Sequence, residues 1–353
     1  MYREHKNETQ QNIDFYSTKT KSFIKTPPFS NTMKHTWTIT IILVLIFLAT
    51  QVFGLFTVNK YIEVLPPGSY LNGTQINKTI ILHNATIVGE APDVAPSTGF
   101  VYVLTAIAAG TVLLLLLIKF RGHKFWAIWF FFAVLVTTAV TLGVYFQRIP
   151  HGYVIALVTA AVLAFIKIYR QNIIIHNITE IFMYTGIAVL FVSFFNILWA
   201  TILLIAISIY DIIAVWHSRH MVKMAKFTME SKLFAGIYFP YKSKKARRVA
   251  LQIKKTKKIK NLKRAKIGQP KNAILGGGDI AFPLLFSAVV MESLILKNIS
   301  PNIAFLQTLI ISFTTTSAIL LLFIFGKRDR YYPAMPFVTT GCLFGYLMII
   351  LLF

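Results

Sequence analysis

Two aspartates of this 353-residue chain stand within or directly beside long apolar runs. Asp211 lies in Ile207-Ser-Ile-Tyr-Asp-Ile-Ile-Ala-Val215, and Asp279 follows three glycines, Gly276 to Gly278. If these runs cross a membrane, each carboxylate costs at least about 2.5 to 3.5 kcal/mol on insertion scales, so one kept there is by default a functional candidate. We therefore take Asp211 and Asp279 as the groups most able to do chemistry.

Two carboxylates that lie close together cannot both ionise readily, so one keeps a proton while the other accepts one from water. Hydrolysis of a peptide bond by an aspartate pair has this requirement: one group is the general base and the other polarises the carbonyl. Because the two groups would titrate as a unit, which is acid and which is base stays open. The glycines beside Asp279 would let water or a second backbone segment approach it closely.

The elements that must position these aspartates are membrane helices. The chain is 56% hydrophobic and only 14% charged, which is too apolar for one soluble domain. A transmembrane helix needs roughly 20 apolar residues, and the sequence offers about nine such runs. We expect an all-α polytopic membrane protein with helices at residues 37–58, 98–118, 125–146, 152–168, 181–197, 199–217, 277–296, 302–326 and 333–353.

The two aspartates are expected at similar depths in the membrane, where they can face each other. The sixth helix is expected to end near His217, which places Asp211 about 9 Å from that end. The seventh starts near Gly277 and runs back, so Asp279 is expected within one turn of the same surface, or deeper if the helix begins nearer Asn272. Pro333-Ala-Met-Pro336 opens the ninth helix at the same surface. Irregular backbone there is tolerated only where it is buried in protein or lines a wet cavity.

Three short segments carry a specific resemblance. Tyr210-Asp211, Gly276-Gly-Gly-Asp279 and Pro333-Ala-Met335 resemble the YD, GxGD and PAL motifs of presenilins, signal peptide peptidases and especially their archaeal homologues. The resemblance implies an intramembrane aspartic endopeptidase that uses no cofactor or metal, with Asp211 and Asp279 as its catalytic pair. It implies site-shaping or substrate-binding roles for a further set of residues: Tyr210, Gly276, Gly278, Pro333, Ala334 and Met335. Met335 departs from the family, which has leucine there, but the two side chains have similar volume.

Charge gives the expected orientation and partners. The net charge is +24, and most basic residues fall between about Arg219 and Lys271, which favours anionic lipid over nucleic acid as partner. The excess of Lys and Arg in alternate loops predicts a cytoplasmic N-terminus and an extracytoplasmic C-terminus. The expected organisation is a cytoplasmic tail (1–36), six helices (37–218) with an extracytoplasmic loop (59–97), a basic cytoplasmic loop (219–272) and three helices (273–353).

This orientation resembles that of presenilins and is opposite to that of signal peptide peptidases, so transmembrane substrates with an outside N-terminus are expected. The basic loop lacks the apolar segment that eukaryotic presenilins cut in themselves, so neither self-cleavage nor obligatory subunits are expected. A cation channel or ion-coupled transporter would also place carboxylates at membrane depth, but we find no inverted repeat and no second acidic layer. Prepilin peptidases share a GxGD aspartate but not the Tyr210-Asp211 and Pro333 elements.

Overall fold

The computed structural model describes residues 37–71, 73–120, 122–170, 172–217, 224, 227–228, 233–241, 271–326 and 332–353. The chain divides into two units, 1–32 and 33–353, and every described residue belongs to the second. The expected N-terminal tail and most of the expected basic loop lie outside the described residues.

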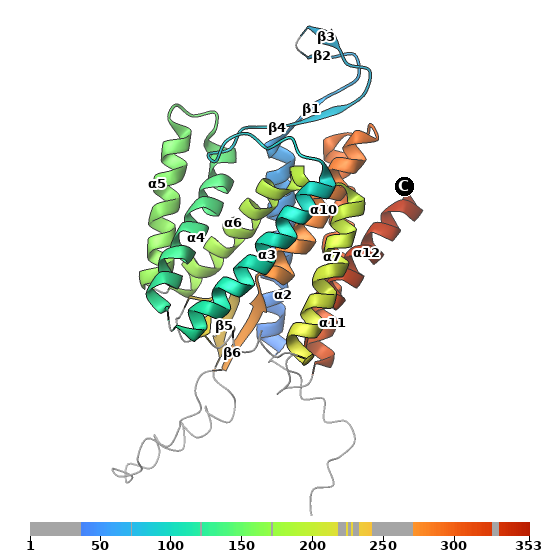
Figure 1. Cartoon of the computed structure of the whole chain (residues 1–353). Helices are drawn as coiled ribbons and strands as arrows, with labels where there is room; N and C mark the ends of the chain where they lie inside the picture. The colour runs from blue at the N-terminus through green and yellow to red at the C-terminus, as the bar shows by residue number, and fades with distance from the viewer. Residues whose placement is uncertain are drawn as a thin grey trace, which may run out of the picture. The chain divides into compact units, whose positions relative to one another are not determined.

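Nine helices of the described residues are long and apolar enough to cross a membrane, so the predicted all-α membrane architecture is confirmed (Figure 1). They are α2 (Trp37–Tyr61), α3 (Pro96–Lys119), α4 (His123–Phe146), α5 (Gly152–Phe165) with the π-helical turn η1 (Ile166–Arg170), α6 (Ile173–Phe191) with the 3-10 turn η2 (Val192–Phe194), α7 (Ile197–Ile212) with the π-helical turn η3 (Ile213–His217), α10 (Gly278–Leu296), α11 (Pro301–Phe325) and α12 (Met335–Leu352).

The fifth helix is longer than the sequence predicted, because α6 begins at Ile173 rather than near residue 181. Asn172 caps its first turn, and its side-chain oxygen accepts hydrogen bonds from the N–H groups of Ile174 (2.9 Å) and Ile175 (3.3 Å). The first two turns carry polar residues that lower the local hydropathy, yet these residues are buried inside the protein. A hydropathy pattern therefore places the start of this helix too late.

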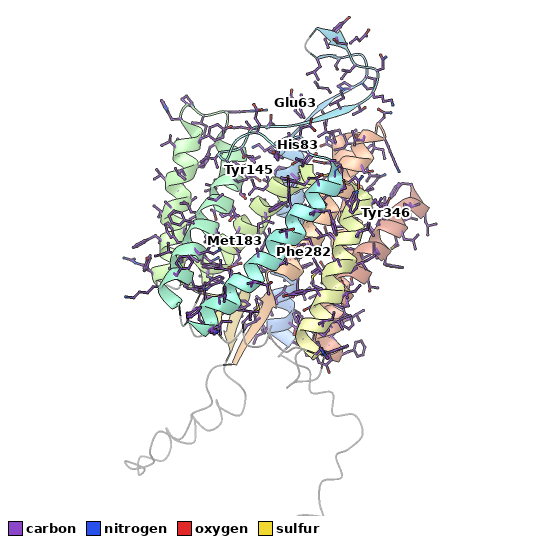
Figure 2. The ribbon with its side chains drawn as sticks, in the orientation of Figure 1. Glu63, His83, Tyr145, Met183, Phe282 and Tyr346 are labelled. Atoms are coloured by element: carbon purple, nitrogen blue, oxygen red, sulfur yellow. The ribbon has the colours of Figure 1, made fainter. Side chains whose placement is uncertain are left out.

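A hairpin that joins α2 to α3 projects beyond one end of the helices (Figure 1), and we name it the outer hairpin for that position alone. Strand β1 (Ile62–Leu65) pairs antiparallel with β4 (Ile80–His83), and the short strands β2 (Tyr70–Leu71) and β3 (Thr74–Gln75) form its tip. At its base, Nε2 of His83 lies 2.9 Å from Oε1 of Glu292, near the end of α10. Figure 2 shows His83 at this end of the helices. The contact ties the hairpin to α10.

A second hairpin precedes α10, and we name it the inner hairpin because its strands enter between the helices. Strand β5 (Gly236–Tyr241) pairs antiparallel with β6 (Lys271–Gly276), and Gly236 lies opposite Gly276. Ile237 and Leu275 are buried, and β5 packs against α6 and α2. Figure 1 shows the two strands entering between the helices from the end opposite the outer hairpin. The helix thus does not continue toward Asn272. A strand fills that segment, and α10 starts inside the bundle.

Helix α10 is the most enclosed of the nine: 78% of an 18-residue apolar stretch of this helix is buried, against 11% of the corresponding stretch of α3. It packs against α2, α6, α7, α11 and α12. On the α2 side, the side-chain amide of Gln51 donates a hydrogen bond to the carbonyl of Ile280 at 2.9 Å, and Gln51 is fully buried. The start of α10 is therefore fixed by a neighbouring helix as well as by β6.

Two glycines allow α11 and α12 to pack closely. Gly341 and Gly345 are four residues apart and face α11: a Cβ at Gly341 would lie 2.8 Å from the Cα of Thr315, and one at Gly345 would lie 2.7 Å from the Cα of Ile311. Small residues at this spacing let membrane helices approach backbone to backbone. The close contact depends on the absence of side chains at both positions.

Gly345→Ala should separate these two helices and lower the free energy of unfolding by about 1 to 3 kcal/mol, the usual cost of overpacking. Unfolding by SDS in mixed micelles would measure it. Gly110→Ala in α3 is the matched control, since a Cβ there would meet nothing within 4 Å. Equal effects of the two substitutions would contradict the packing argument.

Candidate functional site

Asp211 lies in the last turn of α7, and only 4% of the residue is exposed. Its Oδ2 accepts a hydrogen bond from the backbone N–H of Met335 at 3.1 Å. Met335 is the first residue of α12 and follows Pro333 and Ala334. The unpaired N–H groups at the start of a helix stabilise a negative charge. The structure therefore brings the Pro333–Met335 segment directly onto Asp211.

A second contact between the same helices lies one turn further from the inner hairpin. The hydroxyl oxygens of Ser208 and Thr339 are 2.6 Å apart, and both residues are buried. The Thr339 hydroxyl is also 3.4 Å from the carbonyl of Leu204. Because Ser208 precedes Asp211 by three residues and Thr339 follows Met335 by four, the pair stands on the same helix faces. It holds α7 and α12 in the register that the Asp211 contact needs.

Asp279 lies in the first turn of α10 and is partly exposed. Strand β6 leads directly into the glycines that precede it. A Cβ at Gly276 would lie 3.0 Å from Oδ2 of Asp279, and one at Gly277 would lie 2.6 Å from the Tyr184 hydroxyl. At Gly278 the nearest atom would be 3.5 Å away, an ordinary contact. The most crowded of these glycines is Gly277, which the sequence analysis did not select.

The two aspartates come from helices that pack on each other. Helix α10 contacts both α7 and α12, and α7 ends where α10 and α12 begin, on the side of the inner hairpin (Figure 1). Strand β6 ends at Gly276 and α10 begins at Gly278, so Asp279 directly follows the strand and does not lie on a helix continued from Asn272. Both carboxylates thus belong to the same half of three packed helices.

Tyr210 has a different environment from its neighbour Asp211. Its side chain is 36% exposed, and its hydroxyl lies 3.3 Å from the hydroxyl of Thr111 in α3. Consecutive residues of a helix point about 100° apart, so Tyr210 and Asp211 face different partners. The structure places Tyr210 between α7 and the loosely enclosed α3, whereas Asp211 faces α12.

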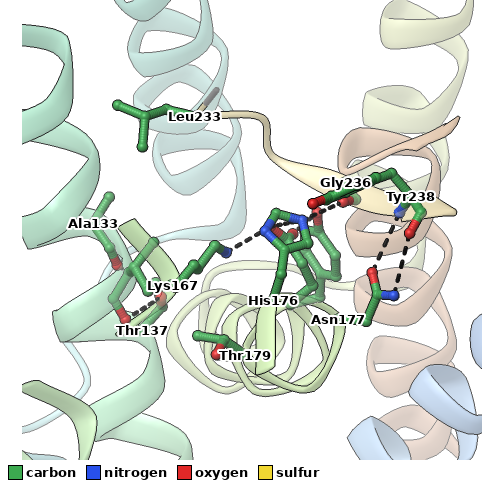
Figure 3. Close-up of polar contacts among 12 residues, drawn as sticks. Ala133, Thr137, Lys167, His176, Asn177, Thr179, Leu233, Gly236 and Tyr238 are labelled. Carbon is green, nitrogen blue, oxygen red and sulfur yellow. Dashed lines mark hydrogen bonds and ion pairs between the residues drawn. The ribbon is translucent and has the colours of Figure 1, made fainter. Parts of the chain in front are cut away.

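A buried polar cluster, missed by the sequence analysis, lies on α6 and η1 (Figure 3). Nζ of Lys167 is 2.6 Å from Oε1 of Glu180, Nε2 of His176 is 3.5 Å from the same oxygen, and the Tyr184 hydroxyl donates to Oε2. Lys167 and Glu180 are 3% and 0% exposed. The helix predicted at residues 152–168 already contains Lys167, whereas Glu180 lies just before the helix predicted at residues 181–197. The spacing of four between His176, Glu180 and Tyr184 was the available signal.

Within the part of the chain that the structure describes, no group of three His, Cys, Asp or Glu residues is arranged to hold a metal ion. The candidate site consists of carboxylates, backbone amides and glycines. These groups can bind and activate water and polarise a carbonyl.

Comparisons with known proteins identify the family and the fold of this chain. The sequence matches the family model described as signal-peptide peptidase, presenilin aspartyl protease over residues 78–353. Two solved structures of a presenilin family intramembrane aspartate protease, in space groups C222 and P2, match with a TM-score of 0.54 and 15% identity. They cover 89% and 90% of this chain, and 99% and 100% of their own. At that identity they show the fold. The search of curated proteins gave no match.

Proposed function

Because this chain belongs to the signal-peptide peptidase and presenilin aspartyl protease family, we propose that it hydrolyses peptide bonds within transmembrane segments, with Asp211 and Asp279 as its catalytic pair. The protein is a multi-pass integral membrane protein. The observation that carries the proposal is the hydrogen bond from the Met335 N–H to the buried Asp211. It joins two motif segments that are 124 residues apart in the sequence.

The chemistry requires a water molecule and one shared proton. The ionised aspartate removes a proton from water, and the resulting hydroxide adds to the substrate carbonyl carbon while the protonated aspartate gives its proton to the carbonyl oxygen. The tetrahedral intermediate then breaks its C–N bond. The amine leaves with a proton from one aspartate, and a hydroxyl proton returns to the pair. The two residues thus exchange roles between the first and the second step, and each turnover consumes one water and returns the pair to its starting state with one proton.

The surrounding residues have supporting roles in this proposal. The backbone at Pro333, Ala334 and Met335 holds Asp211 and forms one wall for the substrate. Gly276 and Gly278 keep the approach to Asp279 free of side chains, as the 3.0 Å separation between a Cβ at Gly276 and the carboxylate supports. Tyr210 contacts α3 and lines the side on which that loosely enclosed helix lies.

We propose that the substrates are single helices with an outside N-terminus, and that the N-terminus of this protein is cytoplasmic. The bias of Lys and Arg toward alternate loops supports this orientation. The basic stretch within residues 219–272 is proposed to bind anionic lipid. Most of it lies outside the described residues. No partner subunit is proposed.

Two substrates would test the function and the orientation together. Each carries the same apolar helix, and basic residues on one flank or the other set its direction in the membrane. Co-expression with this protein should give cleavage of the helix with an outside N-terminus only. Cleavage of the inverted helix alone would overturn the proposed orientation but not the activity.

Purified protein in liposomes would separate proteolysis from ion transport. A transition-state analogue with a hydroxyl in place of the scissile carbonyl should block cleavage, because it occupies the position of the tetrahedral intermediate. A channel or ion-coupled transporter would instead show cation flux that the analogue does not block. Flux without cleavage of either substrate would replace the protease proposal with the transporter.

A further inference from the structure

One face of α6 carries three buried polar side chains. His176, Glu180 and Tyr184 follow each other at a spacing of four, so they line one side of the helix. They are 6%, 0% and 2% exposed. Together with Lys167 of η1 they form a connected set of contacts, which we name the α6 polar face; Figure 3 labels Lys167 and His176 of this set. Nothing in the proposed reaction uses these groups.

Glu180 fixes the direction of the Tyr184 hydroxyl. Oε1 of Glu180 is 2.6 Å from Nζ of Lys167, and its Oε2 accepts from the hydroxyl of Tyr184. With one oxygen held by the lysine and the other by the tyrosine, the carboxylate has a defined plane. A charge-assisted hydrogen bond is also stronger and more directional than a neutral one. The Tyr184 ring and hydroxyl therefore have one orientation.

Tyr184 meets the turn that carries Asp279. A Cβ built on Gly277 would lie 2.6 Å from the Tyr184 hydroxyl oxygen and 2.9 Å from its Cε1, so the tyrosine lies directly against this glycine backbone. The carbonyl of Gly277 accepts hydrogen bonds from the N–H groups of Ile280 (3.1 Å) and Ala281 (2.9 Å). These bonds start α10. The position of Gly277 thus sets the start of the helix and, two residues later, Asp279.

The other end of the α6 polar face holds the strand beside this segment. Nε2 of His176 is 3.0 Å from the carbonyl of Gly236, which lies opposite Gly276 in the hairpin. The side-chain amide of Asn177 pairs with both the N–H and the carbonyl of Tyr238, each at 3.3 Å. Helix α6 therefore fixes β5, β5 fixes β6, and Tyr184 fixes the turn after β6.

Burying the Lys167–Glu180 ion pair between helical segments carries a desolvation penalty in free energy. Replacing a buried ion pair by apolar residues of similar volume is often neutral or stabilising, so helix packing alone does not explain this one. What an apolar pair does not supply is a directed acceptor for the Tyr184 hydroxyl. A charged carboxylate that accepts from the Tyr184 hydroxyl is the group expected here if the protein requires one orientation of that tyrosine.

We propose that Tyr184, oriented by the Lys167–Glu180 pair, is a positioning residue for Asp279 and acts through its contact with Gly277. The inference rests on the proposed function of Asp279. Tyr184 would touch neither water nor substrate. Its effect is to place the Asp279 carboxylate at the separation from Asp211 that the shared proton requires.

Tyr184→Phe tests the proposal in the full-length protein, reconstituted in liposomes with a single-span substrate. The substitution keeps the ring and removes one hydroxyl. We expect kcat to fall about tenfold or more, since a displacement of about 1 Å at a reacting group can cost about a hundredfold. KM should stay within about twofold, because the substrate-binding surface is unchanged.

Tyr145→Phe is the matched control. It removes a hydroxyl that is 2.8 Å from the Thr57 hydroxyl, and Figure 2 shows Tyr145 near the outer hairpin. Its kcat should stay within about twofold of wild type, although both variants lose one side-chain hydrogen bond, which is buried at Tyr184 and partly buried at Tyr145. A fall in kcat for Tyr184→Phe that the control reproduces would overturn the proposal, as would wild-type kcat in Tyr184→Phe.

Gly277→Ala approaches the same contact from the other side, so it also serves if Tyr184→Phe folds poorly. Gly277→Ala should lower kcat and leave KM unchanged. In the double variant Tyr184→Phe with Gly277→Ala, the fold-loss of kcat should be smaller than the product of the two single fold-losses, because both substitutions act through one contact. Losses that simply multiply would contradict a shared contact.

The same measurements distinguish a failure of the proposed function from a failure of the Tyr184 proposal. If the wild type cleaves no substrate, the proposed function fails. If it cleaves and requires Asp279 but not Tyr184, this inference alone fails.

Discussion

Asp211→Asn and Asp279→Asn should each abolish cleavage of a single-span substrate. Asparagine keeps the shape of the side chain but cannot exchange the proton on which both steps of the reaction depend. Loss of an essential group in an enzyme lowers kcat by about 10⁴-fold or more, and removing both members of a unit costs little beyond removing one. The double variant should therefore be no less active than either single variant. Cleavage by purified protein in detergent measures this.

The control for these substitutions is a third acidic residue. Glu292→Gln also neutralises a largely buried carboxylate of α10, but Glu292 pairs with His83 at the outer end of the helix. It should retain cleavage. The amide oxygen in Asp211→Asn can still accept from the Met335 N–H, so the fold around α12 should be kept. Substantial cleavage by either single asparagine variant would remove the dyad assignment.

Glu180→Gln should destabilise the protein by about 3 to 5 kcal/mol, because it leaves the charge of Lys167 buried without its partner. Lys167 is 3% exposed, so water does not replace the lost carboxylate. Its ammonium lies 5.2 Å from the centroid of the Phe130 ring, and this contact offsets only a small part of the loss. The free energy of unfolding, measured by SDS titration in mixed micelles, gives the cost.

A double variant isolates the charge effect. Lys167→Met together with Glu180→Gln removes both charges, and we expect most of the lost stability to return. Glu292→Gln is the comparison for a pair nearer the surface, since the His83 and Glu292 side chains are 19% and 10% exposed. It should cost clearly less than Glu180→Gln. Equal costs for the two single variants, or a double variant as unstable as Glu180→Gln, would show that the Lys167–Glu180 charges are not coupled.

The helices were predictable because membrane crossing depends on local composition. About 20 consecutive apolar residues are a signal that no distant contact can erase. The same reasoning placed Asp211 six residues before the end of a helix and Met335 at the start of another, on the same side. Their direct contact through the Met335 N–H is a matter of side-chain geometry that the sequence does not contain.

The inner hairpin and the α6 polar face were not predictable in this way. Strands β5 and β6 pair across residues 242–270, and nothing local to either strand identifies its partner. Lys167 and Glu180 each look like the boundary of a helix when hydropathy is averaged over a window, since one charge lowers the average. Only their mutual contact makes both tolerable inside a membrane protein. Such pairs are recognised from tertiary structure.

Helix α10 has a mechanical consequence for the protein as a whole. Its 19 residues span about 28 Å at 1.5 Å per residue, with Asp279 near one end and Glu292, bound to the outer hairpin, near the other. Pro283 has no N–H to donate to the carbonyl of Asp279, so the part of α10 from Pro283 to Glu292 is the part that resists compression along its axis as a rod. A load applied to the outer hairpin would therefore displace this rod, whose inner end at Pro283 is one turn from Asp279. The lightly enclosed α3, by contrast, is not among the helices that pack closely against α10.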